Sequence, residues 1–186
     1  MPNSNIKALK EAIQEHWSGK PSDKAKRYIG RFFEMTVTET RISAKVEGNY
    51  GIYTVSVQKD DKNLSSACSC YIGKYGNCHH CEALALTFLS NSSAFRKTET
   101  VDLGDISDLS DLQRYLGGTT LDSLLKELRS KGITQKSIAE CIGMHTRHLS
   151  AVRTSELRNR YHGELGAVKL ACLWVLEHLG KDRTKH

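Results

Sequence analysis

The sequence predicts an α+β fold in two parts, a small antiparallel sheet with flanking helices and a C-terminal all-helical region. Near residue 33 the apolar spacing changes from three or four residues to alternation, and after residue 78 it returns to the helical period. A polar, acidic stretch then separates this part from a purely helical pattern. These observations predict a domain over residues 1–97, a linker over 98–118 and a second domain over 119–186, which suits a chain of 186 residues.

The first domain combines short helices with β-strands. Apolar residues at helical spacing over 6–17 predict the first helix, and Ser22 is placed to cap a second one that reaches Tyr28. The β-branched and alternating segments predict an antiparallel meander of about four strands. These strands are 33–40, 42–46, 53–57 and 64–68. The helical period after Cys78 predicts a helix that ends at Asn91.

The second domain has the pattern of consecutive helices. A short helix over 108–116 precedes a break at Gly117 and Gly118. Further helices are expected over 121–128, from Thr134 to the interruption at Gly143, over 146–154 and over 164–179. The last of these is followed by Gly180, which is expected to end it.

Positive charge is concentrated in the two predicted domains. Residues 1–100 hold 14 Lys and Arg against 10 Asp and Glu, residues 101–118 hold 1 against 4, and residues 119–186 hold 12 against 7. Two basic modules therefore flank an acidic strip, which favours a polyanionic partner.

Neither a membrane span nor a secretion signal is expected. The longest apolar run, over 167–179, is interrupted by Lys169, Glu177 and His178. Residues 1–10 contain no apolar signal core. We therefore expect a cytoplasmic protein, associated with the nucleoid if its host is a bacterium or a phage.

Four of the six cysteines lie within residues 68–81, where two histidines accompany them. In an unsecreted chain this density favours a metal site over disulfides, and zinc binds four such donors at the corners of a tetrahedron. A Cys₃His set of Cys68, Cys70, Cys78 and His80 leaves no coordination position open for catalysis. His79 and Cys81 remain alternative ligands, and buried thiols without a metal are the competing interpretation. Cys141 and Cys172 lie alone in apolar helical patterns and are expected to be core thiols.

These residues resemble the SWIM zinc finger. The shared pattern is Cys-x-Cys, a short loop, Cys-x-His and an apolar helix, preceded by Ala25, Tyr28, the segment 44–48 and the segment 53–55. The resemblance covers roughly residues 22–90. It implies that Cys68, Cys70, Cys78 and His80 bind zinc and that the module contacts DNA or another protein. His79 would then be a surface residue or a hydrogen-bond donor beside the site, and Cys81 a thiol on the helix.

A second constellation lies in the helical domain, where two helices meet at a sharp turn. Ala139 supplies the small side chain at the crossing, Gly143 tolerates positive φ at the turn, and Thr134 caps the first helix. The apolar face comprises Ile138, Ile142, Met144, Leu149 and Val152. This arrangement resembles the helix-turn-helix of phage-repressor (Cro-like) regulators, over roughly residues 119–180.

The resemblance implies that the second helix enters the DNA major groove. The outward positions are His145, Thr146, Arg147, Ser150, Ala151 and Thr154. Arg147 is suited to guanine, and Ala151 to a thymine methyl group. Gln135 would reach a phosphate or brace the second helix, and Lys136, Arg153, Arg158 and Arg160 would contact phosphates.

The expected function is that of a zinc-containing, sequence-specific DNA-binding protein, most simply a transcriptional regulator. Its partner would be double-stranded DNA. By resemblance, the protein would bind this DNA as a homodimer, and the zinc module would also be available to contact a protein partner. The alternative is a protein-interaction adaptor in a DNA repair or recombination assembly. An enzyme is not expected, because the chain has no phosphate-binding glycine loop and no serine–histidine–acid arrangement. The least favoured interpretation is an enzyme that uses Cys81 or His79.

Overall fold

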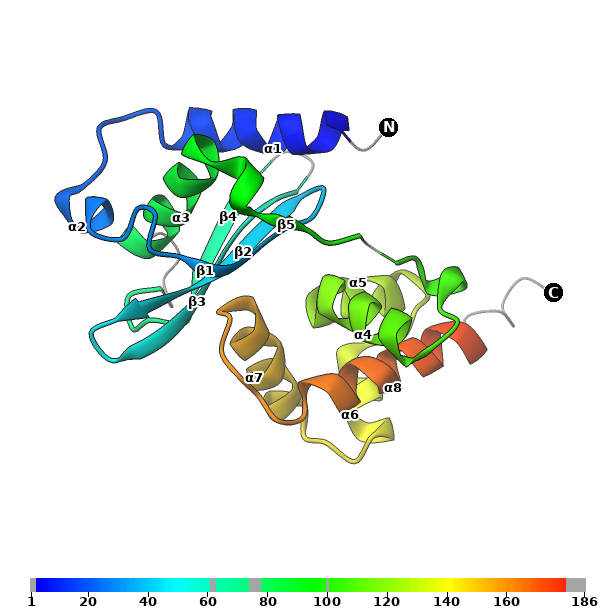
Figure 1. Cartoon of the computed structure of the whole chain (residues 1–186). Helices are drawn as coiled ribbons and strands as arrows, with labels where there is room; N and C mark the ends of the chain where they lie inside the picture. The colour runs from blue at the N-terminus through cyan, green and yellow to red at the C-terminus, as the bar shows by residue number, and fades with distance from the viewer. Residues whose placement is uncertain (1–2, 61–62, 74–77, 100, 180–186) are drawn as a thin grey trace. The chain divides into compact units, whose positions relative to one another are not determined.

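A computed structural model describes residues 3–60, 63–73, 78–99 and 101–179, with side chains from residue 6 onward (Figure 1). The chain forms two compact units. The first is Met1–Glu99 together with Arg158–Arg160, and the second is Thr100–Leu157 together with Tyr161–His186. Each unit has its own hydrophobic core.

The first unit is a five-stranded sheet with helices, in the strand order β4-β3-β2-β1-β5. Its helices are α1 (Asn3–His16), α2 (Asp23–Lys26), α3 (His79–Ser90) and the 3₁₀ turn η1 (Ser92–Ala94). Its strands are β1 (Phe33–Val37), β2 (Arg41–Gly48), β3 (Gly51–Lys59), β4 (Leu64–Cys68) and β5 (Arg96–Lys97). β1 to β4 form the expected antiparallel meander.

The fifth strand corrects the expectation of a purely antiparallel sheet. β5 pairs with β1 in parallel, with Thr36 opposite Arg96 and Val37 opposite Lys97. The crossover from β1 to β5 includes α3, and such a crossover is what a parallel neighbour requires. β5 has only two residues, too few for an alternating pattern to be recognised in the sequence.

The core of the first unit lies between the sheet and helices α1 and α3, which cover the same face (Figure 1). Alternate residues of β2, namely Ile42, Ala44 and Val46, are buried. Leu9 of α1 and Phe88 of α3 are fully buried against them. This packing holds α3 on the sheet, so its first turn is fixed close to the end of β4.

In its described residues the second unit consists of helices joined by turns, with no strand. It comprises η2 (Leu103–Asp105), α4 (Leu109–Gly118), α5 (Leu121–Ser130), α6 (Gln135–Cys141), α7 (Thr146–Leu157) and α8 (Leu165–His178). α8 ends before Leu179, and Gly180 lies outside the described residues.

The segment expected to be a linker, 98–118, differs from that expectation. Leu103, Tyr115 and Leu116 pack against the core of the second unit. α4 also continues through the two glycines that were expected to break it. The acidic side chains explain the difference, because Asp108 caps α4 by accepting a hydrogen bond from the Asp111 amide at 2.8 Å. Polar composition here marks a helix start, and residues 101–118 belong to the second unit, whereas residues 98 and 99 belong to the first.

A buried ion pair crosses the core of the second unit. Lys169 Nζ lies 2.5 Å from Glu156 Oε1, and the side chains are only 7% and 13% exposed. Lys169 also donates to the Leu116 carbonyl at 2.7 Å. The other Glu156 oxygen accepts the Leu121 amide at 2.6 Å, at the start of α5. The lysine that interrupts the apolar run of α8 thus joins α4, α5 and α7.

No helix within the described ranges combines the length and apolar character needed to cross a membrane.

Candidate functional site

Four potential metal ligands meet at the junction of β4 and α3. Cys68 ends β4, Cys70 follows it in the next turn, Cys78 is the N-cap of α3, and His80 lies in the first turn of α3. All four are buried. Their ligand atoms lie within 4.8 Å of one another, which is compatible with a bound metal ion.

The distances within the cluster fit tetrahedral coordination. His80 Nδ1 lies 3.7 Å from Cys68 Sγ and 3.8 Å from Cys78 Sγ. Around a tetrahedral zinc ion, Zn–S and Zn–N bonds of usual length place sulfur and nitrogen about 3.6 Å apart. The cluster therefore needs little rearrangement to surround one ion. The other ring nitrogen of His80, Nε2, is buried and has no hydrogen-bond partner among the described residues.

Backbone contacts shape the turn that carries the first two cysteines. The Ser69 amide donates to the Thr54 carbonyl at 3.0 Å, and the Ser69 hydroxyl accepts the Thr54 amide at 3.0 Å, so the turn is tied to β3. The Gly73 amide donates to Cys70 Sγ at 3.2 Å. A Cβ atom at Gly73 would lie 2.2 Å from the Cys68 carbonyl oxygen. Only glycine allows the chain to pass this close to the cluster.

The thiols are electrostatically coupled. Hydrogen bonds from Cys68 and then Cys81 hold the pKa of Cys78 far below its ordinary value. Conversely, the hydrogen bond with Cys78, followed by burial, raises the pKa of Cys68. Burial is the main cause that raises the pKa of Cys70. Zinc binds cysteine as the thiolate, so a dication that enters this site displaces the thiol protons.

The two alternative ligands lie at the margin of the cluster. The set of four residues with mutually close ligand atoms includes neither His79 nor Cys81. The His79 ring stacks against Tyr28, with centroids 5.5 Å apart, and burial lowers its pKa. Cys81 Sγ is buried and lies 3.7 Å from Cys78 Sγ.

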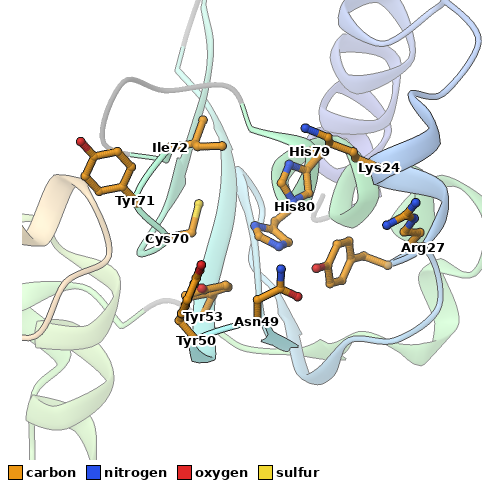
Figure 2. A pocket seen from close by; sticks show the side chains of 11 residues that line it. Lys24, Arg27, Asn49, Tyr50, Tyr53, Cys70, Tyr71, Ile72, His79 and His80 are labelled. Atoms are coloured by element: carbon orange, nitrogen blue, oxygen red, sulfur yellow. The ribbon is translucent and has the colours of Figure 1, made fainter.

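A cavity of about 300 Å³ opens beside the cluster (Figure 2). Its lining combines cationic and aromatic side chains with part of the cluster, namely Lys24, Arg27, Tyr28, Asn49, Tyr50, Tyr53, Cys70, Tyr71, Ile72, His79 and His80. Figure 2 shows Tyr71 and Ile72 on one side and Lys24 and Arg27 on the other. The described lining contains no carboxylate. No sequence pattern marks this cavity, because its walls come from separate elements: α2 and the residues after it, the β2–β3 turn, β3, the cysteine turn and the start of α3.

Cys141 corrects the expectation of two core thiols, because it is exposed whereas Cys172 is buried. Burial raises the pKa of Cys172 to about 11. In the metal-loaded protein, we expect a thiol reagent to label Cys141 rapidly and the other five cysteines slowly, since these are buried. Counting of labelled thiols by mass spectrometry checks this. A strong chelator should then release the cluster thiols, and rapid labelling in a Cys141→Ala variant without chelator would contradict the prediction.

In the second unit, α6 and α7 meet at a tight turn. The Thr134 hydroxyl caps α6 by accepting the Ser137 amide at 3.1 Å. Gly143 has φ of 67° in the turn, and the Met144 amide donates back to the Ala139 carbonyl at 2.7 Å. Ala139 and Leu149 are fully buried between the helices. The cap, the small crossing residue and the positive-φ glycine occupy the places that the sequence predicts.

One face of α7 carries five of the eleven residues expected to contact DNA. These residues are Thr146, Arg147, Ser150, Ala151 and Thr154, and all except the half-buried Thr146 are exposed. At about 100° of rotation per residue around a helix, the five positions span an arc of about 140°. Gln135 Nε2 donates to Ser150 Oγ at 2.7 Å, so Gln135 braces α7.

Other residues in that expected set are engaged elsewhere. Arg153 Nε lies 2.9 Å from Asp122 Oδ1, and Lys136 Nζ lies 3.7 Å from Glu140 Oε1. His145 Nδ1 accepts the Arg147 amide at 3.1 Å and so caps α7. Arg158 and Arg160 follow the end of α7 at Leu157 and are grouped with the first unit.

Comparisons of this chain with known protein families, curated proteins and solved structures found no match. Its chemistry is therefore inferred from its own residues. They provide a buried Cys₃His cluster compatible with a metal ion, and a helix pair with an exposed polar and basic face.

Proposed function

We propose that this protein is a zinc-containing, sequence-specific DNA-binding protein and acts as a transcriptional regulator. The observation that supports the proposal most strongly is the exposed face of α7. This helix follows α6, which is capped by Thr134, and a turn at Gly143, and it packs against α6 through buried residues. This is the arrangement by which a helix-turn-helix presents its second helix to the major groove. The net positive charge over residues 119–186 favours the same partner.

The identity of the ion as zinc rests on donor chemistry. Three cysteine sulfurs and one imidazole are a usual zinc set, whereas magnesium and calcium prefer oxygen. All four positions are filled by protein, so the ion stabilises the fold and has no place for a substrate.

Base reading is assigned to the start of α7. Arg147 is exposed near the N-terminus of the helix, the region from which helix-turn-helix proteins contact base edges. Its guanidinium suits the paired acceptors of guanine, and Ala151 suits a thymine methyl group. Ser150 is held by Gln135, so it serves as an oriented hydroxyl.

The cavity beside the zinc cluster supports a nucleic-acid contact by the first unit as well. Lys24 and Arg27 offer phosphate partners, and the tyrosines of the lining offer faces on which bases can stack. The exposed Leu170 and Trp174, four residues apart on α8, support a contact with a second copy.

The Arg147→Ala variant tests the sequence-reading role. We expect preference at one base pair to relax, at a cost of about 1–3 kcal/mol in binding that duplex. Selection of bound duplexes from a random pool, with zinc present, identifies the target, and anisotropy titrations then compare the variants on that duplex.

Arg129→Ala is the matched control, because Arg129 is an exposed arginine on α5 outside the proposed DNA-contacting set. Binding should weaken steeply as salt rises, since phosphate contacts release counterions. If each of the two variants bound all duplexes with the same affinity, sequence reading would be excluded. Absence of salt-dependent DNA binding would favour the protein-interaction adaptor.

A further inference from the structure

A second group of potential ligands lies in the helical unit, apart from the cysteine cluster. His148 is on the first turn of α7, His162 is in the segment before α8, and Glu164 is the N-cap of α8. Their ligand atoms lie within 4.8 Å of one another. Two imidazoles and a carboxylate from separate elements thus converge on one point.

The contacts within this trio leave a buried nitrogen without a hydrogen-bond partner among the described residues. His148 Nε2 lies 2.5 Å from Glu164 Oε2. The His148 and His162 rings meet edge to face, with centroids 5.4 Å apart. His162 Nδ1 is buried and has no hydrogen-bond partner among the described residues. The contact between His148 and Glu164 therefore explains the positions of only two of the three side chains. A buried nitrogen without a hydrogen-bond partner is unfavourable unless something binds it.

The backbone holds the three side chains in place. The Leu165 amide donates to the His162 carbonyl at 3.1 Å, which forms a turn at the start of α8. The Val168 amide donates to the Glu164 carbonyl at 3.0 Å, so the first turn of α8 fixes Glu164. His148 is anchored by α7, whose next residue, Leu149, is fully buried. The site is thus formed by ordered elements.

The surroundings leave room for further ligands of an ion. A cavity of about 480 Å³ borders His148 and Glu164 and is also lined by Met144 and His145. An ion held by three protein groups completes its coordination with water, for which this space suffices. Imidazole donors favour zinc, cobalt, nickel or copper over calcium or magnesium.

We propose that His148, His162 and Glu164 bind a divalent first-row transition-metal ion. The ion joins α7 to the start of α8. His148 lies about 100° around α7 from Arg147, so the ion leaves the face with Arg147 and Ser150 accessible. The proposal rests on the geometry of these three residues and does not depend on DNA binding or on the cysteine site.

Metal counting on the full chain tests the proposal. The trio is expected to bind with a micromolar Kd, so free Zn²⁺ at about 100 times that Kd nearly fills the site. Under this condition we expect two zinc ions per wild-type chain, and one per chain in His148→Gln and in Glu164→Gln. Cobalt provides a second readout, because a thiolate site gives strong sulfur-to-cobalt charge-transfer absorption. The imidazole–carboxylate site adds only weak visible bands, and these should be missing in the two variants.

His178→Gln is the matched control, since His178 lies on α8 outside the trio and stacks on Trp174. It should retain both ions. The helical circular dichroism signal shows that the second unit of each variant is folded, and retention of the cysteine-bound ion shows the same for the first unit. Either of the two trio variants suffices if the other does not fold. One ion per wild-type chain, or two in both trio variants, would overturn the proposal. A metal count that contradicts this proposal would leave the proposed DNA binding intact. Equally, absence of DNA binding would leave the proposed metal site intact.

Discussion

Replacement of Cys70 by serine is expected to release the metal and unfold the first unit. Cys70 is 5% exposed, and its sulfur accepts the Gly73 amide, so the substitution removes both a ligand and the anchor of the cysteine turn. Structural zinc binding contributes about 10–16 kcal/mol in small finger peptides, and a small domain has a net stability of about 5–15 kcal/mol. Loss of this binding energy is therefore enough to unfold a short sheet covered by two helices.

The measurement uses metal analysis together with urea unfolding followed by fluorescence. Trp17 packs against the first core and Trp174 lies on α8, so a Trp174→Phe background leaves a probe of the first unit alone. Cys141→Ser is the matched control, because Cys141 is exposed and lies outside the cluster. A chelator should reproduce the effect of Cys70→Ser. Full metal occupancy with an unchanged unfolding curve would disprove the structural role of the cluster.

Replacement of Lys169 by methionine is expected to destabilise the second unit by about 3–5 kcal/mol, the usual cost of removing one partner of a buried ion pair. Glu156 would keep its bond from the Leu121 amide but lose its countercharge, and the Leu116 carbonyl would lose its donor. The structural consequence is a loosened junction of α4, α5, α7 and α8.

Urea unfolding in a Trp17→Phe background, with Trp174 as the probe, measures this effect. Lys136→Met is the control, because Lys136 pairs with Glu140 on the surface, where such a pair contributes about 0–1 kcal/mol. Adding Glu156→Leu to Lys169→Met should recover part of the loss, since it removes the isolated carboxylate. Equal effects of the Lys169 and Lys136 substitutions would show that the buried pair is not important for stability.

The elements that the sequence predicts correctly are those with a local signal. Alternation of Ile42, Ala44 and Val46 indicates β2, and the spacing of Leu121, Leu124 and Leu128 indicates α5. The donors of the cysteine cluster are likewise recognisable, because they lie within a single stretch of the chain. Residue spacing is sufficient wherever neighbours in sequence determine the contact.

The remaining features depend on contacts between distant residues. β5 is a strand only because β1 lies beside it, and Lys169 is satisfied only by groups 13 and 53 residues away. The exposure of Cys141 depends on which side of α6 packs against the core. The trio of His148, His162 and Glu164 requires the chain to reverse between α7 and α8. None of these contacts has a periodic signature.

The separation of the two hydrophobic cores has a consequence for thermal denaturation. No buried residue is shared between the two core clusters among the described residues, so each unit can melt as its own cooperative transition. The heat capacity trace of the whole chain should then contain two peaks. If zinc binds the cysteine cluster as proposed, the peak of the first unit should move with free zinc concentration, as mass action requires. A single melting temperature quoted for this protein would average two processes and describe neither.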